Sequence, residues 1–160
     1  MEFVVARDPV VEPAALELAE FVPFRLNRLA SAVSDDLSQI YRRRFGLEIP
    51  EWRVLVTVGQ RGECSAQHIA ASTRMHKTRV SRAVAGLEQR ALLERALNAQ
   101  DGRELRLHLT RSGRRTYEVL VPLALERERK LLSCLGAHQQ RAFREALTSL
   151  EQSLGLSSDE

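Results

Sequence analysis

Two short helical patterns followed by a tight polar turn between two strand-like segments constrain this chain more than any other feature. The helical patterns lie between Ser65 and Arg90, and the turn Asp101-Gly102 separates segments 92–97 and 103–109. The second segment alternates leucine with polar residues, and an Asp-Gly turn supplies the positive φ that a tight hairpin needs. Helix, helix, hairpin is the order of a winged helix-turn-helix lobe.

Amphipathic helices are predicted before this lobe. Apolar residues at three- and four-residue spacing predict a long helix from Pro23 to about Arg44, preceded by a short helix or arm over 13–21. The segment 45–50, which ends in a proline, is expected to break that helix. A second helix is predicted over 51–60.

Within and after the lobe, hydroxyl residues mark the helix starts. Ser65 is expected to cap a helix over 66–72, and a fourth helix runs from about residue 77 to 90. Thr110 is expected to cap a fifth helix over 111–132, in which Pro122 predicts a kink or a break. A last helix, 137–154, follows a glycine, with an apolar face made of Phe143, Ala146, Leu147 and Leu150.

Positive charge is concentrated in the predicted lobe. From Arg74 to Arg115 there are eleven Lys and Arg residues against four Asp and Glu, whereas the net charge of the whole chain is only +3. A cationic face on a helix-turn-helix and a hairpin attracts a phosphate backbone. We therefore expect double-stranded DNA as the partner.

Several other classes of function find no support in the sequence. It contains no P-loop, nucleophile elbow, zinc-protease motif or glycine-rich dinucleotide loop, so we expect no enzyme and no cofactor. The four histidines lack the spacing of a metal site, so we expect no metal. No apolar run is long enough for a membrane span, and two cysteines make no disulfide framework, so we expect a cytoplasmic protein.

The fourth helix has an apolar face and a slim polar face. At about 100° per residue the inward positions are Val80, Ala83, Val84, Leu87 and Ala91. The outward positions are Thr78, Ser81, Arg82, Ala85 and Gln89, with Lys77 and Arg79 on the flanks. Thr, Ser and Arg side chains can address base edges in a major groove, and the flanking cations can neutralise phosphates. An ordinary solvated helix face is the alternative interpretation.

The candidate DNA-binding residues belong to the helix-turn-helix and the hairpin tip. They are Ser65, His76, Lys77, Thr78, Arg79, Ser81, Arg82, Asp101 and Arg103. At the tip, the Asp101 carboxylate is expected to hold the Arg103 guanidinium, which could then enter a narrow minor groove. A plain surface ion pair is the alternative there.

These segments together resemble the MarR-type winged-helix regulators. The resemblance covers about Leu26 to Leu150 and is carried by Ser65–Met75, Thr78–Leu87, Leu92–Arg95, Asp101–Arg103 and Leu109–Gly113, with Trp52 and Leu55 in the second helix. Two positions depart from the family pattern. The first half of the wing motif is replaced by Asn98-Ala99-Gln100, and Ala91 stands where a glycine is common, which predicts a helix end without a left-handed cap.

The resemblance implies a homodimer that represses transcription and responds to a small ligand. In that arrangement the chain is one domain over 1–160: dimerisation helix region 13–46, winged lobe 47–112 and dimerisation helices 113–155. Candidate effector-binding residues are Arg25, Arg28, Trp52 and Tyr117, which suit a hydrophobic or aromatic acid or its thioester. Solvent-exposed arginines and core aromatic residues are the alternative.

Two other functions stay open at this point. Some members of the family sense oxidants through a cysteine, and Cys64 precedes a helix N-terminus, whose dipole lowers thiol pKa values. A structural thiol is the more common role for a cysteine such as Cys64 or Cys134. A winged helix can also bind a protein partner instead of DNA.

Overall fold

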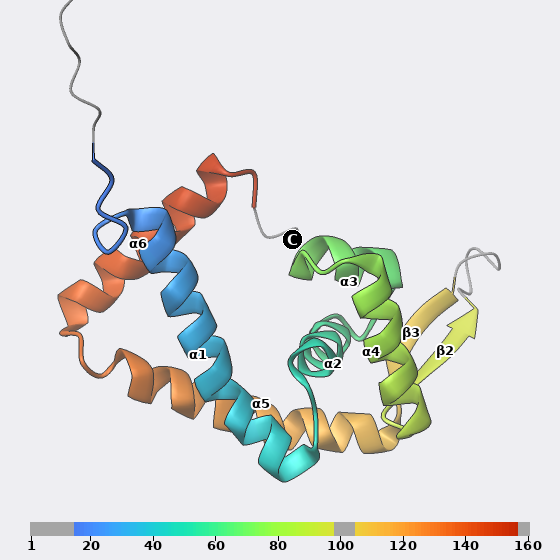
Figure 1. The fold of residues 1–160 in the computed structure, drawn as a ribbon. Helices are drawn as coiled ribbons and strands as arrows, with labels where there is room; N and C mark the ends of the chain where they lie inside the picture. The colour runs from blue at the N-terminus through green and yellow to red at the C-terminus, as the bar shows by residue number, and fades with distance from the viewer. Residues whose placement is uncertain (1–14, 98–104, 157–160) are drawn as a thin grey trace, which may run out of the picture. The chain divides into compact units, whose positions relative to one another are not determined.

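The computed structural model describes residues 15–97 and 105–156, most of which are helical (Figure 1). The chain divides into two compact units, Met1–Val33 and Ser34–Glu160. The helices are α1 (Val22–Phe45), α2 (Ile49–Arg61), α3 (Ala66–Thr73), α4 (Lys77–Gln89), α5 (Arg111–Leu132) and α6 (Ala137–Ser153). Within the described residues, no helix is long and apolar enough to cross a membrane.

A small antiparallel sheet accompanies the helices. Its strands are β1 (Glu63–Cys64), β2 (Leu93–Leu97) and β3 (Leu105–Leu109), in the order β1-β3-β2. The hairpin β2–β3 is confirmed, and its register pairs Leu97 with Leu105. Sequence reasoning missed β1, because two residues are too few to show a strand alternation. The Asp101-Gly102 tip and the adjoining Arg103 lie outside the described residues.

Helix α2 lies at the centre of the lobe's core. Val54, Leu55 and Val58 are fully buried, and α2 contacts α3, α4, α5, β1 and β3. Buried apolar residues of α4 and the sheet complete the same cluster. The winged helix-turn-helix arrangement predicted from the sequence is therefore confirmed.

The segment 45–50 separates α1 from α2 as predicted, although α2 begins within it, and Pro122 does not interrupt α5. Helix α2 begins at Ile49, so Pro50 lies in its first turn, where the missing N–H would have no helical partner. The Glu48 N–H donates to the Glu51 carboxylate (2.8 Å), which closes the helix start. Helix α5 continues through Pro122, where a helix of 22 residues tolerates the loss of one backbone hydrogen bond.

The end of α4 also differs from the prediction. Ala91 is left-handed (φ 52°), exposed and beyond the helix, so it is neither an inward residue nor a plain helix end. Its N–H donates to Glu88 O, and the Leu92 N–H donates to Leu87 O, both at 2.9 Å. This is a Schellman cap formed without glycine, in which buried Leu92 supplies the apolar contact.

We expect Ala91→Gly to raise the free energy of unfolding by about 0.5–1 kcal/mol. Glycine removes the left-handed strain of an L-residue, and this gain exceeds the entropy it adds to the unfolded chain. Urea denaturation measures the change. Gln89→Gly, at the exposed last helical residue, is the control and should lower stability by a similar amount. A destabilised Ala91→Gly variant would contradict the cap.

The helices outside the lobe leave much apolar surface uncovered. No residue of α6 is buried; Phe143 and Leu147 are half-buried, and Ala146 and Leu150 are exposed. The exposed large apolar side chains of α5, α6 and the segment after α6 are Val119, Leu125, Leu131, Leu150 and Leu154. In the unit Met1–Val33 they are Leu16, Leu18, Phe21, Val22, Leu26 and Leu29.

An ion pair ties α5 to the part of α1 in the unit Ser34–Glu160. The Arg127 guanidinium donates two hydrogen bonds to the Asp36 carboxylate, and both groups are partly exposed. That hydrogen bonding, with a smaller contribution from the charges of Arg127 and Lys130, lowers the pKa of Asp36. The pair therefore stays charged at neutral pH.

Candidate nucleic-acid interface

Helices α3 and α4 form the helix-turn-helix, and each begins with a side-chain cap. The Ser65 hydroxyl accepts from the His68 N–H (3.2 Å), which confirms the predicted cap of α3. In the turn, Arg74 is left-handed (φ 52°) and exposed. His76 caps α4, because its Nδ1 accepts from the Thr78 N–H at 3.3 Å. These contacts fix where α4 starts.

The two faces of α4 are as the sequence predicts. Val80, Ala83, Val84 and Leu87 are buried, with exposed fractions of 5% or less. The exposed residues on the opposite face and its flanks are Lys77, Thr78, Arg79, Ser81, Arg82, Ala85 and Gln89. The outward surface is therefore narrow, polar and cationic, with an alanine and short hydroxyl side chains that let a groove wall approach closely.

Arg90 anchors the C-terminal end of α4 and was not singled out as a functional residue from the sequence. Its guanidinium donates to Phe45 O and Gly46 O at the end of α1, and lies 3.6 Å from the Glu51 carboxylate. One turn earlier, Gly86 leaves room for that carboxylate: a Cβ there would lie 2.6 Å from its Oε1. No local sequence pattern indicates this contact, because its partners lie about 40 residues away.

Thr110 and Gly113 join α4 to α5. The Thr110 hydroxyl donates to Ala91 O (2.6 Å) and accepts from the Gly113 N–H (3.0 Å), which confirms the predicted cap of α5. The Thr110 N–H donates to Leu92 O at 3.2 Å. A Cβ on Gly113 would lie only 1.8 Å from Leu92 O, so the backbone of α5 touches the cap of α4 directly.

Apart from Arg95, the described part of the wing's inner face is apolar. Leu93 and Leu107 are buried, whereas Leu97 (66% exposed) and Leu105 (48% exposed) face each other near the tip. The prediction that Asp101 holds Arg103 for insertion into a minor groove falls on residues outside the described part of the chain. It stays a prediction.

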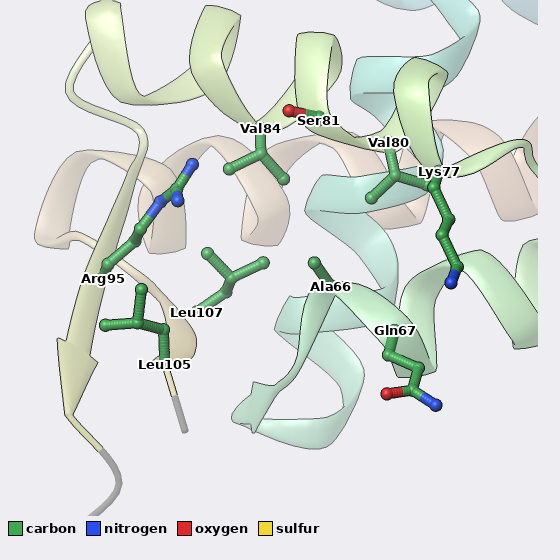
Figure 2. A pocket seen from close by; sticks show the side chains of 9 residues that line it. All are labelled: Ala66, Gln67, Lys77, Val80, Ser81, Val84, Arg95, Leu105 and Leu107. Atoms are coloured by element: carbon green, nitrogen blue, oxygen red, sulfur yellow. The ribbon is translucent and has the colours of Figure 1, made fainter. Parts of the chain in front are cut away.

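A groove of about 260 Å³ separates α4 and α3 from the wing (Figure 2). Its floor is apolar, and polar side chains lie at its edges. The residues that line it are Ala66, Gln67, Lys77, Val80, Ser81, Val84, Arg95, Leu105 and Leu107. Gln67 and Arg95 are exposed polar groups of this face that the sequence analysis did not place in the site.

The predicted effector-binding arginines lie in the unit Met1–Val33. Arg25 is 3.6 Å from the Glu20 carboxylate, and the Arg28 guanidinium lies over the Phe24 ring at 5.6 Å. A shallow hollow on this unit has a volume of about 600 Å³ and is lined by Ala19, Val22, Arg25, Leu26, Arg28, Leu29 and Ala32. Two arginines at the edge of an apolar hollow suit the carboxylate of a hydrophobic acid.

The predicted aromatic candidates make packing contacts in the unit Ser34–Glu160. The Trp52 ring stacks on that of buried Tyr41, with centroids 5.4 Å apart. Tyr117 packs on Gly59, where a Cβ would lie 2.3 Å from the ring. The Arg114 guanidinium lies 5.4 Å from the centroid of the Tyr117 ring and donates a hydrogen bond to Gly59 O (3.0 Å). Both aromatic residues therefore have packing partners within this unit, and their contact with an effector stays a prediction.

The environment of Cys64 disfavours a reactive thiolate. Cys64 is 1% exposed in β1, and burial raises the pKa of its thiol, against the smaller opposing effects of Arg61 and Arg106. Cys134 is exposed after the end of α5. Among the described residues, no group of three His, Cys, Asp or Glu side chains is placed to hold a metal ion.

We expect iodoacetamide to alkylate Cys134 in the folded protein and to spare Cys64 until the protein unfolds. The reagent cannot reach a buried thiol, and a protonated thiol is a poor nucleophile. Peptide mass mapping after labelling with and without urea measures both sites. Equal labelling of Cys64 and Cys134 in the native protein would contradict this result and favour an oxidant-sensing role.

Comparison with known proteins agrees with this geometry. The model of the MarR family matches residues 45–104. The chain is 31% identical over 101 residues to the HTH-type transcriptional regulator BilQ of Clostridium symbiosum (strain WAL-14163), covering 63% of this chain and 67% of that protein.

Solved structures have the same fold. A MarR/EmrR family transcriptional regulator from Acinetobacter sp. ADP1 superposes with a TM-score of 0.79 at 27% identity, over 88% of this chain and 99% of that one. CouR from Rhodococcus jostii RHA1, whose crystal structure has p-coumaroyl-CoA bound, superposes with a TM-score of 0.75 at 21% identity, over 85% of this chain and 95% of that one. The fold class predicted from the sequence is thus confirmed independently.

Proposed function

The chain belongs to the MarR family of transcriptional regulators, and we propose that it is a cytoplasmic, homodimeric repressor released from its operator by a small-molecule effector. The arrangement of α4 is the observation that carries the proposal. The buried apolar side of this helix holds it on the lobe, and its exposed side is narrow enough to enter a major groove about 12 Å wide.

The residues of this face divide into two proposed roles. Thr78, Ser81 and Arg82 point away from the core and would read base edges. Lys77 and Arg79 lie on the flanks and would neutralise phosphates. Ser65 and His76, which cap α3 and α4, would hold the N-termini of these helices against the phosphates of the DNA backbone. Asp101 and Arg103 would extend the contact to a minor groove.

Uncovered apolar surface supports the homodimer. Helix α6 has no buried residue and α5 exposes three large apolar side chains, which is costly for surface left in water. A second copy would cover these helices and the apolar residues of the unit Met1–Val33. Two α4 helices would then meet successive major grooves about 34–36 Å apart on a pseudo-palindromic operator.

The proposed effector is a hydrophobic or aromatic acid, or its thioester. Support comes from the arginine-edged hollow that contains Arg25 and Arg28, and from CouR, which binds p-coumaroyl-CoA. Trp52 and Tyr117 would contribute only if the effector displaced their present packing. An effector releases DNA only if it binds more tightly to a dimer whose recognition helices do not match the grooves.

Selection from a random duplex library, followed by titration at several salt concentrations, tests the DNA-binding function. We expect the selected duplex to bind with an affinity that falls steeply with salt, because phosphate contacts release counterions. A protein that selects no sequence, or whose binding ignores salt, would instead be a partner-binding winged helix.

Calorimetry tests the effector. A candidate aromatic acid and its CoA thioester are each titrated into the protein with and without the selected duplex. Linkage requires DNA to weaken effector binding by the factor by which the effector weakens DNA binding. Equal affinities in the two titrations would exclude that compound as an inducer, however tightly it binds.

A further inference from the structure

We propose that Glu88 and Arg95 are a positioning pair that sets the angle between the recognition helix α4 and the wing; the inference rests on the proposed function. Arg95 belongs to the cationic segment that the sequence analysis assigned to phosphate attraction. The structure gives it a different partner, a carboxylate on α4.

The contact between the two side chains is bidentate. Arg95 Nε donates to Glu88 Oε1 at 2.7 Å, and Arg95 Nη2 donates to Glu88 Oε2 at 3.0 Å. Two parallel hydrogen bonds fix the direction of the guanidinium plane as well as its distance, which a single ion pair does not do. Glu88 lies one residue before the end of α4, and Arg95 lies in the middle of β2.

The groove next to the pair explains why positioning is needed. Lys77, Val80, Ser81 and Val84 of α4 line the groove, and Glu88 follows Val84 by four residues on the same side of the helix. Along Ser81 and Val84 the groove of Figure 2 separates the helix from the hairpin. Where side chains do not interlock, packing alone leaves the angle between two elements loosely defined.

The Arg95 side chain, which lines the groove, reaches from β2 toward α4 (Figure 2). Its stem lies beside Leu107, the cross-strand partner that is buried against the lobe. The pair thus joins the two elements at the level of buried Leu107, two cross-strand pairs before the exposed pair Leu97 and Leu105. An exposed ion pair contributes little to stability, so we expect its effect on DNA binding to exceed its effect on unfolding.

The angle matters because two DNA contacts must be made at once. A helix in the major groove and a wing over the adjoining backbone or minor groove bind together only if their separation matches the duplex. Loosening the wing should therefore cost affinity for the matched duplex, and should cost little on random DNA, which the protein holds by its charge.

Arg95→Lys is the test, because it keeps the charge and removes the bidentate geometry. Binding is measured by fluorescence anisotropy with the duplex selected by the wild-type protein and with a random duplex. We expect about three- to tenfold weaker binding to the selected duplex, an unchanged salt slope, and random binding within about twofold. The control is Arg42→Lys, which alters a comparable two-bond pair with Glu48 at the end of α1 and should change neither affinity.

A charge exchange separates positioning from direct phosphate contact. Arg95→Glu should weaken binding, and adding Glu88→Arg should recover most of the loss if the pair acts by holding the wing. No recovery, or wild-type affinity of Arg95→Lys for the selected duplex, would overturn the inference. So would an equal loss on both duplexes. A wild-type protein that selects no duplex would instead overturn the proposed function, and this inference with it.

Discussion

Replacing Gly113 with alanine is expected to lower the free energy of unfolding by about 3–5 kcal/mol. The added Cβ would lie 1.8 Å from Leu92 O, and the obstacle is backbone that also accepts the Thr110 N–H. Relief would require α5 to move away from the cap of α4, which would break the hydrogen bonds that Thr110 donates to Ala91 O and Leu92 O. Urea denaturation measures the loss.

Ser112→Ala is the matched control, because Ser112 lies in the same first turn of α5 but is exposed. We expect it to change stability by about 0.5 kcal/mol at most. A Gly113→Ala variant as stable as Ser112→Ala would show that α4 and α5 do not meet at this point. The contact between Leu92 O, in the cap of α4, and Gly113 of α5 would then be wrong.

Arg82→Ala is expected to weaken binding to the selected duplex by about 1–3 kcal/mol and to relax preference at one base position. The reason is that Arg82 lies on the outward face of α4, where a guanidinium can make two hydrogen bonds to a guanine edge. Repeating the duplex selection with the variant, and titrating it against single-base changes, identifies the position that is no longer read.

Lys77→Ala is the companion of that substitution. It should weaken all duplexes alike and reduce the salt slope by about one unit, because a phosphate contact carries no sequence information. Both side chains are exposed, so neither variant should change the free energy of unfolding by more than about 0.5 kcal/mol. Identical behaviour of the two variants across a panel of duplexes would contradict the division into reading and positioning residues.

The parts of the fold that follow local rules were predictable from the sequence. Ser65 and Thr110 cap the helices they were expected to cap, and the buried face of α4 follows helical periodicity. The hairpin follows from alternation and its turn residues. Each of these depends on residues no more than a few positions apart.

The errors arose where tertiary contacts decide the outcome. Ala91 adopts a left-handed cap that its intrinsic preference opposes, because Leu92 is buried and its carbonyl meets α5. Pattern reasoning cannot weigh such partners before the fold is known.

The candidate site was predictable in its charge and its exposed face, but not in its supports. Arg90 and Arg95 count as cations in the sequence, yet one holds the end of α1 and the other holds Glu88. The backbone partners of Arg90 lie about 40 residues away, and Glu88, although only seven residues before Arg95, lies in a different element, so residue spacing indicates neither contact. The proposed roles of Asp101 and Arg103 depend on residues that the structure does not describe.

Half-site spacing gives the most direct test of a dimer that reads DNA with two α4 helices. The selected duplex is compared with one whose half-sites are moved apart by about half a turn, roughly 5 base pairs, which rotates one site to the opposite side of the helix. We predict that the altered duplex binds no more tightly than random DNA, in the same anisotropy titration. Equal affinity for the two duplexes would contradict the account.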